Sequence, residues 1–346
     1  TDAGLAAVPD GDAVDLIDTR RMKLVRKLAP ARPAEAAALT GDRRSVVTVD
    51  GGGELLVWPT DGGEPSLRLQ LGEGCGTRFI WPEPGTRRLA LHCKADRLLW
   101  LDLAAPGARR ELGVYPGRPV HTFIATGAAL VFGTQDGDLW LSEGPGGPPR
   151  RLAGYSFSIL ALAEVPGRRE IVFSADDLVV RYGLDVGELG RYSGHPLQVG
   201  SLLVSPDGRR VITAGRDNSI RVFDRETAAL QLELFSPELL QRMIALSPDG
   251  DRLAIVVADD QVLLWDLGES GADVTQRDFR RLHQGSQAVA LAFDRDGDLL
   301  AVSAERVIRW HDDLPRDPDG LRRWIVDNAD EGTPPPRAQV GCVAPE

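Results

Sequence analysis

Three residues of this sequence have the side-chain types of a hydrolytic triad. His195 could act as a base, Thr213 as a hydroxyl nucleophile and Asp217 as the acid that orients the base. A working triad also needs an exposed nucleophile and an oxyanion hole, and the surrounding sequence indicates neither. The role of the three residues therefore depends on the elements that position them.

A run of alternating aspartates, Asp294-Arg295-Asp296-Gly297-Asp298, resembles the start of a calcium-binding loop. A complete loop of the EF-hand type continues for about five residues and closes with a glutamate. Here the chain goes straight into the apolar run LLAVSA. We interpret the segment as a structural turn between two strands.

The cysteines are Cys75, Cys93 and Cys342, an odd and low count that gives no disulfide framework and fits a reducing compartment. Cys75 is expected to open an inner strand and Cys93 to end the next strand, which would make the thiols neighbours. We expect buried free thiols, with a bridge or a metal pair as the alternative. Two sulfurs make a poor zinc site, and the sequence has no phosphate-binding loop or metalloprotease motif, so we predict no cofactor and no catalysis.

The net charge of −11 and the isoelectric point near 5.1 argue against nucleic acid as a partner, because nucleic-acid binding needs a basic surface. The sequence has no apolar run of about 18 residues and no visible signal peptide, so we expect no membrane partner and a cytoplasmic monomer. The heavy use of Ala, Gly, Pro and Arg suggests a bacterial source. The start at Thr1, in the middle of the pattern described next, suggests a piece of a longer chain.

A repeat organises the whole chain. Each unit contains a short apolar run that closes with an aromatic or large apolar residue, often followed by aspartate. Successive spacings are 41, 42, 40, 42, 41, 42 and 45 residues. The closing residues are Ile17, Trp58, Trp100, Trp140, Tyr182, Phe223, Trp265 and Trp310.

Each unit divides into four short runs separated by turns. Between Val199 and Phe235 the runs cover 199–205, 210–215, 219–224 and 229–235. The turns at 206–208 and 216–218 contain Pro, Asp, Gly and Asn, which favour the required φ angles. Such a unit predicts a four-stranded antiparallel sheet with an apolar centre and a mixed outermost strand. A single sheet of this kind cannot bury both of its faces, so the units must pack together in a ring.

Two of the units resemble the WD-repeat family, on the residues Gly194-His195, Ser205-Pro206-Asp207-Gly208, Asp217 and Trp265-Asp266. The resemblance covers roughly residues 4–314. It implies an all-β fold, a single β-propeller of four-stranded antiparallel blades over residues 1–314. Residues 315–346 would form a short C-terminal helix and a tail that packs on the propeller or closes it.

The resemblance also implies a role for the triad-like residues. In the family the turn aspartate accepts a hydrogen bond from the histidine, which bonds the hydroxyl of the second strand. His195, Thr213 and Asp217 would thus form a buried structural network. Phe223 stands where the family usually has tryptophan, so we expect the network to lack that donor.

Eight third-strand positions favour eight blades, with seven as the alternative if the N-terminal hairpin is displaced. The first unit lacks an inner strand and the last unit lacks an outer one. We expect the segment around Arg337–Val343 to supply the missing inner strand and close the ring. Asp319 is expected to cap a helix that packs on the last blade in place of its outer strand.

Propellers of this kind bind partners on the face made by the loops that enter the inner strands and the turns that join the second and third strands. Aromatic and arginine side chains on such a face are suited to be interface hot spots. Tyr155-Ser156-Phe157 is the most suggestive segment, although Phe157 could instead belong to the core. By alignment, the candidate partner-binding residues are Arg78, Lys94, His121, Tyr155, Phe157, Arg216 and Arg242.

We predict a non-catalytic interaction, scaffold or sensor module of a larger bacterial signalling or defence protein. Its partner would be another protein, a peptide or another domain of the parent chain. One alternative is a propeller enzyme of the hydrolase or lyase type, with catalytic groups in the central channel. A second alternative is a purely structural spacer between neighbouring domains.

Overall fold

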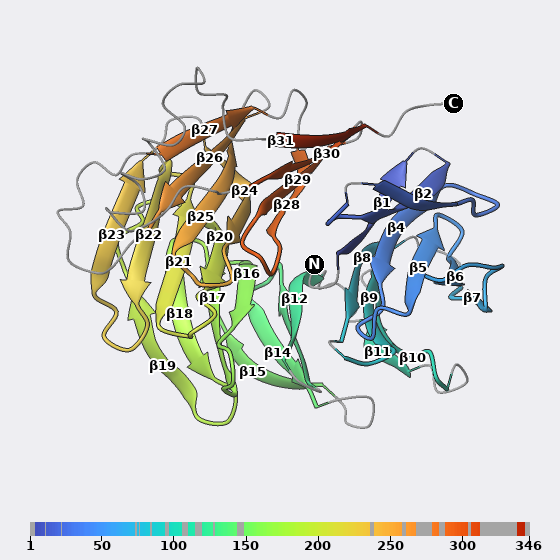
Figure 1. The fold of residues 1–346 in the computed structure, drawn as a ribbon. Helices are drawn as coiled ribbons and strands as arrows, with labels where there is room; N and C mark the ends of the chain where they lie inside the picture. Colours follow the sequence, from blue (N-terminus) through green and yellow to red (C-terminus); the bar gives the residue numbers. More distant parts are fainter. Residues whose placement is uncertain are drawn as a thin grey trace, which may run out of the picture.

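The computed structural model describes residues 4–10, 12–21, 23–72, 75, 77–83, 85–93, 97–105, 110–114, 120–126, 129–143, 149–235, 239–257, 261–267, 279–283, 288–303, 306–311 and 338–342. Within these residues every regular element is a β-strand, and the strands form eight antiparallel sheets. Figure 1 shows the sheets side by side in a ring. The prediction of an all-β, eight-bladed propeller is confirmed, and the seven-bladed alternative was wrong.

We number the sheets as blades 1 to 8 in chain order. Blade 1 contains β1 (Leu5–Asp10), β2 (Ala13–Asp18) and β3 (Lys23–Leu28). Blade 2 contains β4 (Ala34–Leu39), β5 (Ser45–Asp50), β6 (Glu54–Pro59) and β7 (Leu67–Gln70). Blade 3 contains β8 (Thr77–Pro82), β9 (Arg88–Cys93), β10 (Arg97–Asp102) and β11 (Arg110–Val114). Blade 4 contains β12 (Val120–Thr126), β13 (Ala129–Thr134), β14 (Asp138–Ser142) and β15 (Arg150–Gly154).

Blade 5 contains β16 (Ile159–Glu164), β17 (Glu170–Ala175), β18 (Leu178–Gly183) and β19 (Gly187–Tyr192). Blade 6 contains β20 (Val199–Val204), β21 (Arg210–Gly215), β22 (Ser219–Asp224) and β23 (Leu230–Phe235). Blade 7 contains β24 (Leu239–Leu246), β25 (Arg252–Val257), β26 (Gln261–Asp266) and β27 (Phe279–His283). Blade 8 contains β28 (Ala288–Phe293), β29 (Leu299–Ser303), β30 (Arg306–Trp310) and β31 (Ala338–Cys342).

Burial follows strand order within a blade. The second strands β5, β17 and β25 are buried along their whole length, whereas the outer strand β23 alternates between buried and exposed residues. Six of the seven closing aromatic residues of the third strands are buried, with Trp100 and Trp265 each only 2% exposed, and Trp140 is half-buried. The apolar surface is therefore buried between neighbouring blades, as face-to-face packing requires.

Blade 1 has three described strands, and its missing strand is the inner one. Every pairing between an inner and a second strand in blades 2 to 8 contains a register shift, whereas the β1–β2 pairing has none. The Gly4 carbonyl accepts a hydrogen bond from Thr19 N at 2.8 Å, as the Arg209 carbonyl before a second strand accepts one from Arg225 N. Strand β1 is therefore a second strand, and β1 to β3 lack an inner partner among the described residues.

The C-terminal strand completes the last blade rather than the first. Strand β31 pairs with β30 from Trp310↔Ala338 to Arg306↔Cys342, which makes it the outer strand of blade 8. The expectation that residues 337–343 form an inner strand of blade 1 was wrong, because the open outer edge of β30 takes them up. The helix expected to replace this outer strand does not do so, and the helix itself lies outside the described residues.

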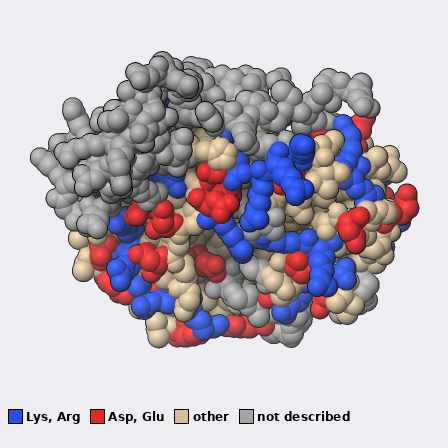
Figure 2. All heavy atoms as spheres, viewed as in Figure 1, with Lys and Arg blue, Asp and Glu red and all other residues tan. Residues whose placement is uncertain are grey.

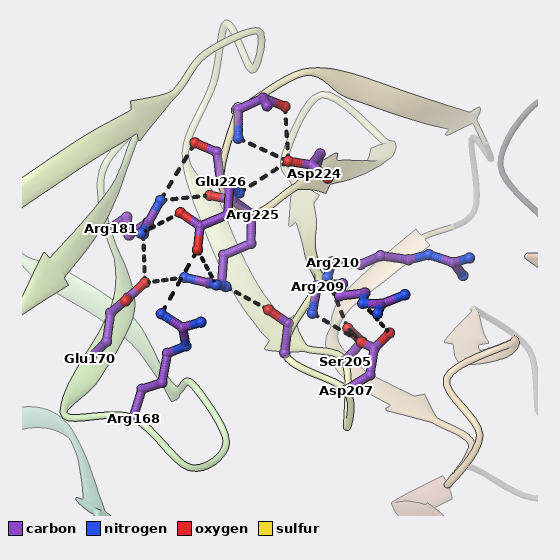
Figure 3. A network of polar contacts seen from close by, with 12 residues as sticks. Arg168, Glu170, Arg181, Ser205, Asp207, Arg209, Arg210, Asp224, Arg225 and Glu226 are labelled. Atoms are coloured by element: carbon purple, nitrogen blue, oxygen red, sulfur yellow. Dashed lines mark hydrogen bonds and ion pairs between the residues drawn. The ribbon is translucent and has the colours of Figure 1, made fainter.

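Blades 5 and 6 are joined by a network of charges, of which Glu170, Arg181 and Arg225 are largely buried and Glu226 is exposed (Figure 3). Glu170 of β17 accepts from Arg181 Nε at 2.5 Å and from Arg225 Nη1 at 2.8 Å. Arg181 also reaches Glu226 Oε2 at 2.7 Å and the Arg225 carbonyl at 3.2 Å. Each cation thus lies between carboxylates of two blades, which fixes the position of one blade on the next.

The aspartate-rich turn of blade 8 meets an arginine. Asp294 Oδ1 accepts from the backbone N–H groups of Asp296 and Asp298, which closes the turn. Arg309 Nη2, from β30, lies 2.8 Å from Asp294 Oδ2 and 2.6 Å from Asp298 Oδ2. The carboxylates that suggested a calcium loop therefore face a buried guanidinium group.

Cys75 and Cys93 are joined by a disulfide, with their Cα atoms 4.6 Å apart, and both are fully buried. The expectation of two free thiols was wrong. Cys93 ends β9 directly opposite Thr77, and Cys75 lies two residues before Thr77, so the Cα atoms fall within the span of a disulfide. The bond removes the support that the cysteine count gave to a reducing compartment.

Candidate functional site

Loops of blades 4, 5 and 6 form a continuous surface on one face of the ring, held by hydrogen bonds that involve their backbones. Ser158 Oγ donates to the Gln135 carbonyl at 2.5 Å, and Tyr155 N donates to the Gly137 carbonyl at 2.9 Å. One blade further on, Val199 N donates to the Asp176 carbonyl at 2.8 Å. We call residues 135–137, 155–158, 176–177, 196–198 and 216 the blade 5–6 loop surface.

Two apolar side chains project from this surface. Phe157 is 56% exposed and Leu197 is 52% exposed. Each lies two residues before an inner strand, β16 or β20, so the two occupy matching positions in adjacent blades. The alternative interpretation of Phe157 as inner-strand core was wrong, because the chain enters β16 only at Ile159, which is fully buried.

Tyr155 has a different role from its neighbour Phe157. Its ring packs edge-on against the Phe173 ring, with the ring centroids 5.1 Å apart. Its hydroxyl donates to Glu188 Oε2 at 3.3 Å. Burial, followed by the nearby Glu188 carboxylate, raises the pKa of the Tyr155 hydroxyl above its usual value. Tyr155 therefore packs against blade 5 and anchors the loop that presents Phe157.

Gly137 explains how this loop lies so close to blade 4. Its φ of +86° is in the left-handed region that glycine favours. A Cβ atom at this position would lie 2.6 Å from the Phe157 carbonyl oxygen and closer still to that of Tyr155. The glycine therefore permits both the turn after β13 and the close approach of the backbone at Phe157 to that turn.

His195, Thr213 and Asp217 lie together beneath the neighbouring loop. His195 Nδ1 lies 3.1 Å from both carboxylate oxygens of Asp217, and Nε2 lies 2.8 Å from Thr213 Oγ1. A proton on Nδ1 lets the ring donate to Asp217 and accept from Thr213, while Arg221 Nη1 also lies 2.5 Å from Nδ1. Thr213 is fully buried, so its hydroxyl is not placed to attack a substrate.

Arg221 joins this group from the third strand β22, and sequence reasoning missed it. Its Nη1 donates to Asp217 Oδ2 at 2.7 Å, and its Nη2 lies 2.5 Å from Glu233 Oε1. Phe223, at the position of the expected tryptophan, is buried and offers no donor. In blade 2 the corresponding Trp58 does donate, from Nε1 to Thr48 Oγ1 at 3.0 Å.

The electrostatics of the group keep it in one charge state near neutral pH. Burial alone would raise the pKa of Asp217, but hydrogen bonds from Arg221, Ser219 and His195 outweigh it and lower the pKa from 3.8 to about 2. Burial lowers the pKa of His195 below 6.5, against the opposing hydrogen bond to Asp217. An anionic carboxylate therefore holds a neutral imidazole, which suits a fixed support for the loop above it.

Of the remaining candidate residues, Arg216 lies on this surface, and the others lie on inner strands or outside the described residues. The backbone places Arg78 in β8, His121 in β12 and Arg242 in β24, all inner strands rather than loops, and their side chains lie outside the described part. Lys94 is outside the described residues altogether. Arg216 is exposed on the turn between β21 and β22 and belongs to the blade 5–6 loop surface.

Metal binding and membrane spanning each have a negative finding within the described residues. They contain no cluster of three or more His, Cys, Asp or Glu side chains that could hold a metal ion. They also contain no helix long and apolar enough to cross a bilayer. On the face shown in Figure 2, Lys and Arg side chains lie beside Asp and Glu side chains, so both signs of charge are interspersed over its described part.

Comparison with known structures shows the class of fold. The computationally designed Ika8 protein superposes with a TM-score of 0.68 over 87% of this chain and 91% of its own, at 18% identity. At that identity the likeness concerns the fold alone. Together with the eight sheets, it defines the chain as a β-propeller.

Sequence comparison defines the kind of propeller. The family model "WD domain, G-beta repeat" matches residues 187–224, which contain His195, Thr213 and Asp217. Protein groucho of Drosophila melanogaster is 33% identical over 105 residues, which are 30% of this chain and 14% of groucho. An uncharacterized WD repeat-containing protein of Schizosaccharomyces pombe is 23% identical over 54% of this chain and 50% of its own length. These findings support a WD-repeat propeller, and the chain spans half or less of the length of these relatives.

Proposed function

We propose that this chain is a protein-interaction scaffold whose partner binds the blade 5–6 loop surface. The observation that carries the proposal is the matched exposure of Phe157 and Leu197, on loops fixed by hydrogen bonds to neighbouring turns. Large apolar side chains on a rigid loop are typical of binding sites, because the scaffold has already ordered them. The resemblance to WD-repeat proteins points to the same general role.

Covering the two side chains would contribute a modest binding free energy. Burying the exposed half of each would contribute roughly 1 kcal/mol, since full burial of such a side chain contributes about 1.5–3 kcal/mol. Because hydrogen bonds tie the loops to turns of blades 4, 5 and 6, little conformational entropy is lost on binding. Phe157 and Leu197 would therefore be two specific contacts within a larger interface, rather than a complete binding site.

We further propose that the ring acts without catalysis, as a module of a larger bacterial signalling or defence protein. A channel enzyme would need acids or histidines where the inner strands begin. The first residues of the described inner strands are instead Ala34, Thr77, Val120, Ile159, Val199, Leu239 and Ala288. The hydroxyl of Thr213 in the triad-like group is fully buried, so it is not exposed as a nucleophile.

Selection from a random peptide library against the immobilised full chain tests the proposal. Enriched peptides, measured by fluorescence anisotropy, should bind at least tenfold more weakly to the F157S/L197S double variant. The matched control is V186S, because Val186 is 76% exposed on a turn of the opposite face. Equal loss with V186S, or no loss with F157S/L197S, would contradict the proposal.

A further inference from the structure

Among the charged residues of the blade 5–6 loop surface, Asp177 and Arg216 carry opposite charges on adjacent turns. Asp177 lies on the turn between β17 and β18, and Arg216 lies on the turn between β21 and β22. Both residues are exposed. Neither side chain makes an ion pair with the part of the chain that the structure describes. These two exposed charges are therefore available to a partner.

Leu197 lies on the loop between these two turns, and the backbone holds the three together. The carbonyl of Asp176, next to Asp177, accepts a hydrogen bond from Val199 N at 2.8 Å. The carbonyl of Gln198 accepts one from Arg216 N, also at 2.8 Å. The loop of Leu197 is thus hydrogen-bonded to one turn at each side. The surface therefore presents an acid, an apolar side chain and a base in a fixed order across the junction of blades 5 and 6.

We propose that the partner supplies an extended peptide segment of complementary order, with Lys or Arg opposite Asp177, an apolar side chain over Leu197, and Asp or Glu opposite Arg216. This inference rests on the proposed function and adds the chemistry of the ligand. An extended segment suits the surface because its side chains alternate in direction, so every second residue faces the loops. Charge complementarity favours it over a uniformly acidic or basic ligand.

The two charges would set selectivity and orientation more than affinity. An exposed ion pair contributes little binding free energy, whereas like charges placed opposite one another disfavour the wrong partner. A peptide with the reverse order of charges would place like charges together at both ends. The surface should therefore select peptides by the order of their charges rather than by the number of charges.

The experiment reverses both charges in the full chain with D177K/R216D. Peptides enriched on the unaltered ring should carry basic, apolar and acidic residues in that order. Their anisotropy titrations should show about tenfold weaker binding to D177K/R216D. A synthetic peptide with its two charges exchanged should regain binding to this variant. The control D61K/R209E reverses two exposed charges on turns of the opposite face and should leave binding unchanged.

Three outcomes would overturn the inference. Enriched peptides without a common charge order would do so, as would equal binding to the unaltered ring and D177K/R216D. In either case, if the enriched peptides bind more weakly to F157S/L197S than to the unaltered ring, the proposed function stands. Only the proposed charge order of the ligand is then rejected. Concentration-dependent dimerisation that L197S abolishes would identify a second copy of the chain as the occupant, which also contradicts a peptide partner.

Discussion

Arg309 of β30 donates from Nη1 to the carbonyl of Arg20 at 3.1 Å, across 289 residues of sequence. The contact joins blade 8 to blade 1 and closes the ring. Arg181 makes the same kind of contact at an internal junction, from blade 5 to the Arg225 carbonyl of blade 6. The seam between the first and last blades is thus built like the other junctions, although blade 1 has only three described strands.

We predict that Arg309→Met destabilises the ring by about 3–5 kcal/mol, because it leaves the buried Asp294 carboxylate without its cation. Urea unfolding followed by tryptophan fluorescence measures the change. Arg209→Met is the control, since the Arg209 side chain is 85% exposed, and its effect should stay within about 0.5 kcal/mol. Equal effects of the two variants would show that the seam does not depend on Arg309.

Gly215→Ala should destabilise the chain by about 1–3 kcal/mol, the usual range for overpacking. Its Cβ would lie 2.5 Å from Asp217 Oδ1 and closer still to His195 Nδ1, so the network would have to shift. Thermal unfolding measures the effect. Gly190→Ala, with no atom within 4 Å of the added Cβ, should leave the midpoint nearly unchanged. A stable Gly215→Ala protein would mean that the network is not tightly held.

Acid should weaken the fold through His195. Its pKa is lowered in the folded chain, chiefly by burial, from an unfolded value of 6.5. The unfolded state therefore binds the proton more readily, and stability should fall as the pH drops below about 6.5. We expect His195→Asn to be less stable at pH 7.5, but to lose less stability between pH 7.5 and 5 than the unaltered chain. Parallel pH profiles would contradict the assignment of a neutral, buried imidazole.

Tyr155 and Phe157 should respond oppositely to substitution. Tyr155→Ala removes the ring contact with Phe173 and should destabilise the chain by about 2 kcal/mol. Phe157→Ser removes a side chain that is 56% exposed, so stability should change little while peptide binding weakens. Calorimetry and anisotropy on both variants separate the two roles. A strongly destabilised Phe157→Ser protein would assign Phe157 to the core.

The eight blades could be predicted from the sequence because the third-strand residues from Ile17 to Trp310 recur at a nearly constant period. The placement of β31 could not, because the connection after Trp310 is long and its sequence pattern does not state which edge the returning strand joins. The loop residues Phe157 and Arg216 were found from alignment with the repeat. Whether Phe157 was core or surface depended on where β16 begins, which the apolar pattern does not fix.

Arg221 was missed although the sequence contained a signal for it. A single arginine inside an otherwise apolar third strand, as in SIRVFD, must find an acidic partner when the strand is buried. The same reasoning applies to Arg181 and Arg309, which both turn out to bridge carboxylates. The partners themselves could not be predicted, because they belong to turns and to neighbouring blades that only the fold brings close.

The most direct test of the central claim is hydrogen–deuterium exchange of the full chain with and without a peptide from the library selection. We predict that binding slows exchange at the backbone amides of residues 155–158 and 195–199. The turns of the opposite face, such as 206–209 and 225–229, should exchange at the same rate with and without peptide. Protection confined to those turns, with no change at 155–158 and 195–199, would contradict the claim that the blade 5–6 loop surface binds the partner.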